Sequence, residues 1–256
     1  MKSKYVLFIL IITSAIGLSL KGYARANAGE PNILFIAVDD LKPTLSNYGD
    51  KIAVTPNFDR LAAKGMTFLN AHCQQAVCGP SRASVMTGHR PDQTRVWDLK
   101  TRIRDENPNI ITMPQHFRAN GYHAVGVGKI FDFRSVQGHE KDDPDSWSRP
   151  YVIFDKNPES EFGLVNPEYV GMVRAKKQAL ALAGDKTPLK QALGGTPPYE
   201  GTEAVADEAY DDGQIARSGV ALIKELAPKK EPFFLAVGFK KPHLPFVAPK
   251  KYWDLY

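Results

Sequence analysis

The residues best suited to chemistry lie in the segment 78–82, which reads CGPSR. The three residues between Cys78 and Arg82 favour a turn that opens a helix, so Cys78 is expected directly ahead of a short helix over 81–86. A thiol in that place faces unpaired backbone N–H groups and the positive end of the helix dipole, which favour an anionic or polarised side chain. The i+4 spacing turns Arg82 back toward Cys78. Cys78 is therefore a candidate nucleophile in an anion-binding corner; the alternative is a small buried hydrophobic residue.

Two adjacent carboxylates follow an apolar run of strand length. Residues 32–38 read NILFIAV, which is typical of a strand buried on both faces in a parallel sheet. Asp39 and Asp40 come directly after it and repel each other unless a cation offsets their charge. A divalent ion with oxygen ligands is the simplest solution. The alternative is that one aspartate caps a helix and the other is solvated.

Two further polar residues follow predicted strands. Lys129 comes after the run 122–127, and His243 lies shortly after the run 233–237. Because the carboxyl ends of parallel strands meet at one edge of a sheet, these side chains and the aspartate pair are expected close together. A histidine there can transfer protons near neutral pH. A solvated lysine and a structural histidine are the alternatives.

The alternation of strands and helices predicts an α/β fold, with a largely parallel mixed sheet flanked by helices. A short helix is expected over 55–65, and further helices over 112–121 and 212–228, the last with an apolar stripe of Ile215, Gly219, Leu222 and Leu226. A short strand is expected over 66–69. Residues 132–212 lack periodicity, which indicates a long irregular insertion over one end of the sheet.

The N-terminus has the pattern of an export signal. Lys2 and Lys4 precede the apolar run 6–20, and residues 24–26 (ARA) fit a cleavage site, so residues 1–26 are predicted to be a signal peptide. A retained membrane anchor is the alternative. The whole chain has 33 basic and 28 acidic residues, but the signal holds four basic residues and no acidic ones. The mature chain is therefore nearly neutral, which removes the main support for nucleic-acid binding.

The chemistry-bearing segments resemble the type I sulfatases. The pattern Cys-x-Pro-Ser-Arg, followed a turn later by Thr87-Gly88, is the signature of that family. Further segments resemble its iduronate-2-sulfatase-like branch: 74–78, 87–92, 113–115 and 234–238. The resemblance implies an alkaline phosphatase-like sulfatase fold, with residues 27–256 forming the N-terminal part of the catalytic domain.

This resemblance implies a sulfuric ester hydrolase. In the family a dedicated enzyme oxidises the cysteine at the position of Cys78 to formylglycine, whose aldehyde hydrate attacks the sulfate ester. Asp39, Asp40 and the modified Cys78 are then expected to bind one Ca²⁺ ion. Arg82 is expected to hold the hydrate, and Lys129 to contact a sulfate oxygen.

His243 lies in a Lys-Pro-His-x-Pro-Phe pattern whose histidine, in the family, contacts the sulfate and protonates the leaving alcohol. One position departs from the family pattern. Many members carry a histidine a few residues after the lysine at position 129, used to deprotonate the hydrate, and Asp132 stands here. The expected base is Asp132, His139 or another group.

The end of the chain bears on the metal site. Residues 252–256 look like the middle of a helix, and two further calcium ligands that the resemblance implies have no candidate before Tyr256. The chain is therefore expected to be truncated, with an incomplete metal shell, and its activity in this form stays open.

The expected partners are a sulfated carbohydrate or related sulfate ester and, during maturation, the formylglycine-generating enzyme. Neither nucleic acid nor a stable membrane anchor is expected, and the export signal predicts a periplasmic or extracellular protein, or one of a secretory organelle. Two other functions remain open: a phosphatase or phosphonate hydrolase of the same superfamily, and an inactive glycan-binding fragment.

Overall fold

The computed structural model describes residues 29–138, 141–152, 160–161, 163–197 and 199–256. Two sequence predictions, the export signal over 1–26 and the candidate base His139, lie outside these residues. No helix among the described residues is both long and apolar enough to span a membrane.

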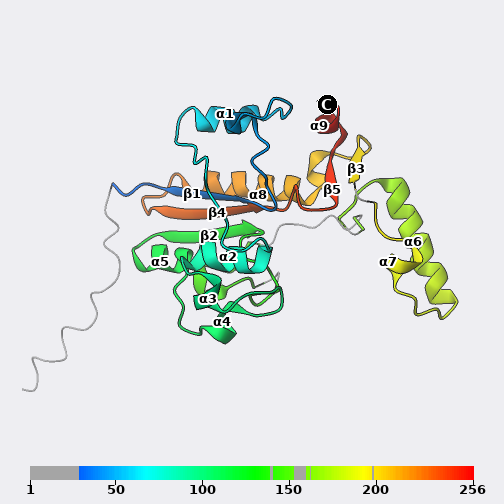
Figure 1. Cartoon of the computed structure of the whole chain (residues 1–256), viewed down its shortest axis with the longest axis horizontal. Helices are drawn as coiled ribbons and strands as arrows, with labels where there is room; N and C mark the ends of the chain where they lie inside the picture. The colour runs from blue at the N-terminus through cyan, green and yellow to red at the C-terminus, as the bar shows by residue number, and fades with distance from the viewer. Residues whose placement is uncertain (1–28, 139–140, 153–159, 162, 198) are drawn as a thin grey trace, which may run out of the picture.

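A three-stranded parallel sheet forms the centre of the molecule (Figure 1). Its strands are β1 (Ile33–Val38), β4 (Phe233–Phe239) and β2 (His123–Gly128), in that order. The register aligns their carboxyl ends, because Val38 pairs with Phe239 and Gly128 with Gly238. The predicted parallel sheet is therefore confirmed, and the residues that follow the three strands emerge at one edge.

The prediction that the first strand is buried on both faces is wrong. Leu34 and Ile36 are 46% and 50% exposed. The strand β1 lies at the border of the sheet, and only its other face, with Phe35, packs against the core. The central strand β4 does have buried side chains on both faces, from Phe233 to Gly238.

Helices cover the sheet on both faces (Figure 1). On one face lies α8 (Asp211–Leu226), whose buried residues are the four of the predicted stripe. On the other face lie α2 (Cys78–Thr87) and α5 (Met113–Ala119). Thr112, the first residue of the helix predicted over 112–121, caps α5 by accepting a hydrogen bond from the Gln115 amide, and Phe117 stacks on Phe234 with ring centroids 4.8 Å apart. These contacts confirm the predicted flanking helices.

The segment after β1 is partly as predicted. The helix α1 (Pro56–Ala62) is present, but the strand predicted over 66–69 is absent. The side chains of Met66 and Leu69 are 79% and 71% exposed. A β-prone run without a neighbouring strand has nothing to satisfy its backbone groups, so it remains irregular.

The segment 132–212 is more regular than predicted. It contains α6 (Pro167–Leu182), α7 (Leu189–Ala192) and β3 (Tyr199–Thr202). Asn166 caps α6 by accepting a hydrogen bond from the Glu168 amide, and strong helix formers continue the helix. This helix has no clear apolar period because only two of its side chains, Val170 and Val173, are buried.

The last residues also differ from the prediction of a continuing helix. The strand β5 (Phe246–Pro249) pairs in parallel with β3, and α9 (Lys250–Trp253) ends after four residues. The indole Nε1 of Trp253 donates a hydrogen bond to the Glu200 carbonyl at 2.9 Å, which draws the chain against β3. The remaining short elements are η1 (Ser46–Tyr48), α3 (Pro91–Thr94), α4 (Ile103–Glu106), η2 (Pro144–Ser146) and η3 (Asp207–Ala209).

Candidate active site

The backbone beyond the strands places the first two polar side chains. The Asp39 amide donates to the Phe239 carbonyl at 3.1 Å, and the Lys129 amide donates to the Gly238 carbonyl at 2.8 Å. Gly128 has a φ of 85°, and a Cβ there would lie 2.2 Å from the Gly238 oxygen. The close approach of β2 and β4 therefore requires glycine at this position, and it sets Asp39 and Lys129 on either side of β4.

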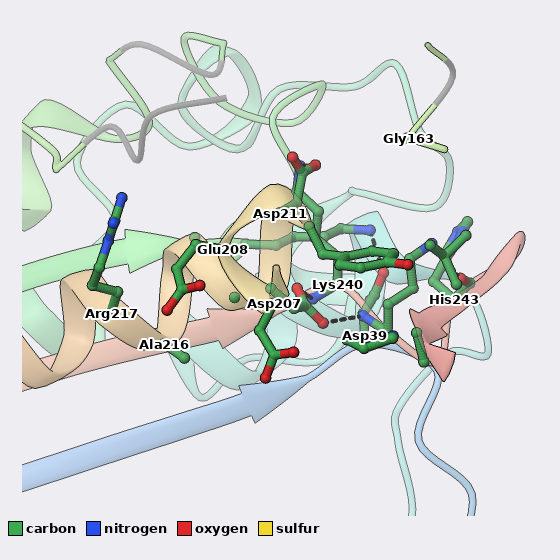
Figure 2. A pocket seen from close by; sticks show the side chains of 18 of the residues that line it. Asp39, Gly163, Asp207, Glu208, Asp211, Ala216, Arg217, Lys240 and His243 are labelled. Carbon is green, nitrogen blue, oxygen red and sulfur yellow. Dashed lines mark hydrogen bonds and ion pairs between the residues drawn. The ribbon is translucent and has the colours of Figure 1, made fainter. Parts of the chain in front are cut away.

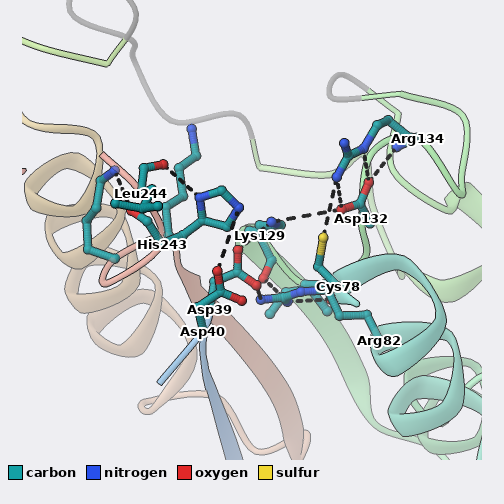
Figure 3. Close-up of polar contacts among 12 residues, drawn as sticks. Asp39, Asp40, Cys78, Arg82, Lys129, Asp132, Arg134, His243 and Leu244 are labelled. Carbon is teal, nitrogen blue, oxygen red and sulfur yellow. Dashed lines mark hydrogen bonds and ion pairs between the residues drawn. The ribbon is translucent and has the colours of Figure 1, made fainter. Parts of the chain in front are cut away.

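The carboxylate of Asp39 lies between two cations (Figure 3). Arg82 Nη2 is 2.9 Å from one oxygen, and Lys129 Nζ donates to the other. Burial by itself raises the pKa of Asp39, but the hydrogen bonds from Lys129 and Arg82 outweigh it and hold this pKa below its usual value. Asp39 is therefore ionised, and both of its oxygens are engaged by protein cations.

Arg82 joins α2 to the ends of two strands. Besides Asp39, its guanidinium donates to the backbone carbonyls of Lys129 and Ile130, the latter at 2.8 Å. The guanidinium is thus fixed at the sheet edge beneath Cys78 (Figure 3). The structure brings Arg82 into the predicted cluster; its role toward the side chain at position 78 stays a prediction.

Cys78 is the first residue of α2, one step inside the helix rather than ahead of it, and its side chain is half-buried. Burial raises the pKa of the Cys78 thiol, and a hydrogen bond to Asp132 raises it further. The thiol is therefore held protonated, which corrects the expectation of an anionic side chain drawn from the helix N-terminus alone. Desolvation and a neighbouring carboxylate outweigh the helix dipole here.

Asp132 lies next to Cys78 in an ion pair that the sequence analysis missed. Its carboxylate is fully buried and accepts two hydrogen bonds from the Arg134 guanidinium, each of 2.8 Å. Burial raises the pKa of Asp132, but the hydrogen bonds from Arg134 and Cys78 outweigh it and hold this pKa well below the usual range. As a candidate base, Asp132 is thus poorly suited to take up a proton. Arg134 Nη2 also lies 3.4 Å from Cys78 Sγ.

His243 stands on the far side of the cluster, on the loop after β4. Its Nδ1 lies 2.8 Å from the Leu244 carbonyl, and since a carbonyl only accepts, Nδ1 carries a proton. Its Nε2 is 3.8 Å from Asp40 Oδ2. Asp40 has a φ of 56° and turns its largely exposed side chain toward His243 rather than toward Asp39.

The loop that carries His243 is anchored at both ends. The Asp212 carboxylate, at the start of α8, accepts from the amides of Lys240 and Lys241 at 2.8 and 2.9 Å. Lys241 Nζ then donates to the carbonyls of His243 and Pro245 at 3.0 and 2.7 Å. These contacts fix the histidine backbone, so Lys241 is a structural residue of the site.

A cavity of about 1340 Å³ opens over this edge of the sheet (Figure 2). Asp39, Lys129 and His243 line it together with the outer side of α8, including Arg217 and Lys224. A volume of this size admits a saccharide or another small organic ester.

The three predicted metal ligands do not form a metal centre by themselves. Within the described part of the chain, no group of three His, Cys, Asp or Glu side chains converges to hold a metal ion. The oxygens of Asp39 face two cations, and Asp40 points elsewhere. Calcium takes about six to eight oxygen ligands. The described residues therefore supply at most part of a calcium shell, and the roles of Asp39, Asp40 and Cys78 as metal ligands stay predictions.

Comparisons with known proteins agree on one family. The Sulfatase family model matches residues 31–256. The chain is 38% identical over 242 residues to iduronate 2-sulfatase of Mus musculus, across 93% of this chain and 40% of that protein. It is 35% identical over 266 residues to a sulfatase of Formosa agariphila, across 100% of this chain and 48% of that protein. The chain thus spans less than half the length of these relatives.

A solved structure supports the fold. The phosphonate monoester hydrolase of Agrobacterium radiobacter superposes with a TM-score of 0.58 at 23% identity, over 89% of this chain and 44% of that one. This likeness, together with those to solved sulfatases, confirms the alkaline phosphatase-like fold. Since the family match also covers almost all of the described residues, the chain belongs to the sulfatase family.

Proposed function

We propose that this chain is the N-terminal part of an exported sulfuric ester hydrolase. Its substrate is a sulfated carbohydrate or related sulfate ester, from which it releases inorganic sulfate. One observation carries the proposal: Asp39, Lys129 and His243 line a single cavity, and Arg82 ties the helix that begins with Cys78 to Asp39. The similarity to iduronate 2-sulfatase, whose name denotes this chemistry, adds support.

The proposed nucleophile is formylglycine made from Cys78 by a formylglycine-generating enzyme. The surroundings of Cys78 fit an oxygen-bearing group, because Arg134 lies within 3.4 Å of Sγ and the half-buried site excludes part of the solvent. A protonated, partly buried thiol is a weak nucleophile, which makes the modification necessary. Formylglycine at position 78 supplies a hydrated aldehyde as the attacking group.

The neighbouring side chains bind and orient the sulfate ester. Lys129 Nζ lies on the cavity wall and donates to sulfate oxygens in addition to Asp39, which stabilises the negative charge that develops there. Arg82 keeps Asp39 and the Lys129 backbone in place. His243, with Nδ1 fixed by the Leu244 carbonyl, presents Nε2 to the leaving alcohol and, when protonated, donates a proton to it.

Calcium belongs to the proposal only as an ion that Asp39, Asp40 and the modified Cys78 would help to hold. A hard divalent cation suits two carboxylates, but the described residues do not complete its shell.

The experiment compares the sulfate and phosphate monoesters of one alcohol, with the protein co-expressed with the formylglycine-generating enzyme. Mass spectrometry of tryptic peptide 65–82 measures conversion of Cys78, because this peptide runs from the residue after Lys64 to Arg82. We expect the converted parent protein to release sulfate and Cys78→Ala to lose this activity. Faster hydrolysis of the phosphate ester would favour a phosphatase, and saturable binding of a sulfated sugar without release would favour a glycan-binding protein.

A further inference from the structure

One charged residue beside Cys78 takes no step in the reaction proposed above. Arg134 lies on the loop after β2, and its Nη2 is 3.4 Å from Cys78 Sγ. The same guanidinium binds Asp132 through Nε and Nη2, each at 2.8 Å (Figure 3). A planar guanidinium held by two parallel hydrogen bonds has a fixed direction, unlike a lysine ammonium.

The loop beneath this pair is itself held. The Asp132 carbonyl accepts hydrogen bonds from the Ser135 amide and hydroxyl, both at 2.9 Å. The Ser135 carbonyl in turn accepts from the Ile103 amide at 2.9 Å. Asp132 is fully buried, and the Arg134 amide also donates to its carboxylate at 3.1 Å. The carboxylate therefore serves as a rigid support for the guanidinium.

We propose that Arg134 is a further catalytic residue, which donates a hydrogen bond to the reacting side-chain atom at position 78. Asp132 is its positioning residue. The inference rests on the proposed function and extends it to a residue that the sulfatase resemblance did not indicate. An oxygen in place of sulfur accepts a shorter and stronger bond from a cation, so the contact gains strength when Cys78 is converted. The donor stabilises negative charge on the attacking oxygen.

Two of the cations near Cys78, Lys129 and Arg134, have separate tasks. Lys129 Nζ is bound to Asp39 and stands 3.9 Å from Asp132, so it belongs to the sheet edge. Arg134 approaches from the opposite side, with over a third of its side chain exposed. It is the cation for which a hydrogen bond to Cys78 is found among the described residues.

The test uses Arg134→Gln and Arg134→Lys, with Arg149→Gln as the matched control. Arg149 also forms a two-bond pair, with Glu225 at 2.7 and 2.9 Å. This control pair lies near the amino end of β2: Ser148, next to Arg149 in the chain, donates a hydrogen bond from its amide to the Ala124 carbonyl. It thus reproduces the chemistry of the ion pair away from Cys78.

The first readout is independent of sulfatase activity. Iodoacetamide alkylation of unconverted Cys78 is followed at one pH by mass spectrometry, in a Cys73→Ser background because Cys73 is exposed and lies on the same tryptic peptide. Loss of one charge-assisted hydrogen bond to the sulfur should slow alkylation about tenfold in Arg134→Gln. Arg149→Gln should stay within about twofold of the parent, which is the scatter expected of a distant surface change.

The second readout uses the converted protein and a sulfate ester. Arg134→Gln should lower kcat about tenfold or more with little change in KM, because the lost bond acts on the attacking atom. Arg134→Lys, which keeps the charge without the fork, should fall between the parent and Arg134→Gln in both readouts.

Alkylation and kcat of Arg134→Gln equal to those of Arg149→Gln would overturn the proposal. If Arg134→Gln fails to fold, the same comparison with Arg134→Lys decides it. If no variant of the full-length protein, the parent included, releases sulfate, the proposed function fails, and the alkylation rates still decide whether Arg134 acts on position 78.

Discussion

Arg82 Nη2 lies 2.9 Å from Asp39 Oδ1, and through this contact α2 is joined to the end of β1. Both side chains are at least 89% buried, and Asp39 has a second cation, Lys129, on its other oxygen. The helix that carries Cys78 is thereby held against the sheet edge by a buried ion pair. Removing one partner of such a pair leaves the other charge uncompensated.

Arg82→Ala should therefore lower the free energy of unfolding by about 3 kcal/mol and abolish sulfate release. Urea denaturation of the parent and the variant measures the first effect. Arg82→Lys keeps the charge but cannot reach Asp39 and both carbonyls together, so it should recover only part of the stability. If Arg82→Ala lowers the free energy of unfolding by less than about 1 kcal/mol, the value is that of an exposed ion pair. It would contradict the buried ion pair between Arg82 and Asp39.

Asp142 should make stability depend on pH. Burial raises the pKa of this carboxyl to about 7, although the Trp147 indole donates a 2.9 Å hydrogen bond to it. Because the folded-state pKa is above the unfolded value of about 4, its stability contribution is fully present below pH 4. That contribution, on the order of 4 kcal/mol, is lost as the pH rises through 7.

Asp142→Asn cannot ionise, so its stability relative to the parent should increase from pH 4 to pH 8. Urea denaturation of both proteins across this range measures the difference. A difference that does not change with pH would mean that Asp142 titrates near its ordinary pKa in the folded protein.

Gly128→Ala should destabilise the sheet edge by about 3 kcal/mol, from a positive φ together with an overpacked contact. The new Cβ would lie 2.2 Å from the Gly238 oxygen and 3.0 Å from Ile215 Cγ2. The control is Gly171→Ala, inside α6. A Cβ added there would meet no heavy atom of the described residues within 4 Å outside its own helix turn, so alanine should stabilise slightly. Equal melting temperatures for the two variants would show that β2 and β4 are not so closely apposed.

In the full-length protein, Asp39→Ala and Asp40→Ala should each abolish sulfate release and reduce calcium retention, because each variant removes a proposed carboxylate ligand of the ion. Equilibrium dialysis with ⁴⁵Ca²⁺ measures metal retention directly. Asp185→Ala is the control, because that carboxylate lies in an exposed turn, where it accepts a hydrogen bond from the Thr187 amide. Calcium retained in either site variant would remove that residue from the ligand set.

Much of the fold could be predicted from the spacing of apolar residues in the sequence. The predicted stripe of α8 is buried because its residues recur every three or four positions against β4. The helix α6 was missed because its partner surface is small, so only Val170 and Val173 needed to be apolar. The run 66–69 has strand composition without a neighbour, and composition alone does not supply one.

The sequence predicted the position of those site residues that directly follow a strand. Asp39 and Lys129 follow parallel strands whose register is set by β4, so their proximity followed from the topology. Arg134 could not be found this way, since it meets Cys78 only after the loop beyond β2 folds over the start of α2. The protonated state of the thiol likewise depends on burial, which the local sequence does not reveal.

The burial of α2 also bears on when the chain can be modified during its synthesis. Pro80 and Arg82 are buried in the folded protein, and Arg82 is tied to Asp39, 43 residues earlier in the chain. An enzyme that must read both side chains to find Cys78 has no access to them once the sheet edge has assembled. Under the proposed function, conversion of Cys78 would therefore compete with folding, and a chain that folds first would keep a protonated thiol at position 78.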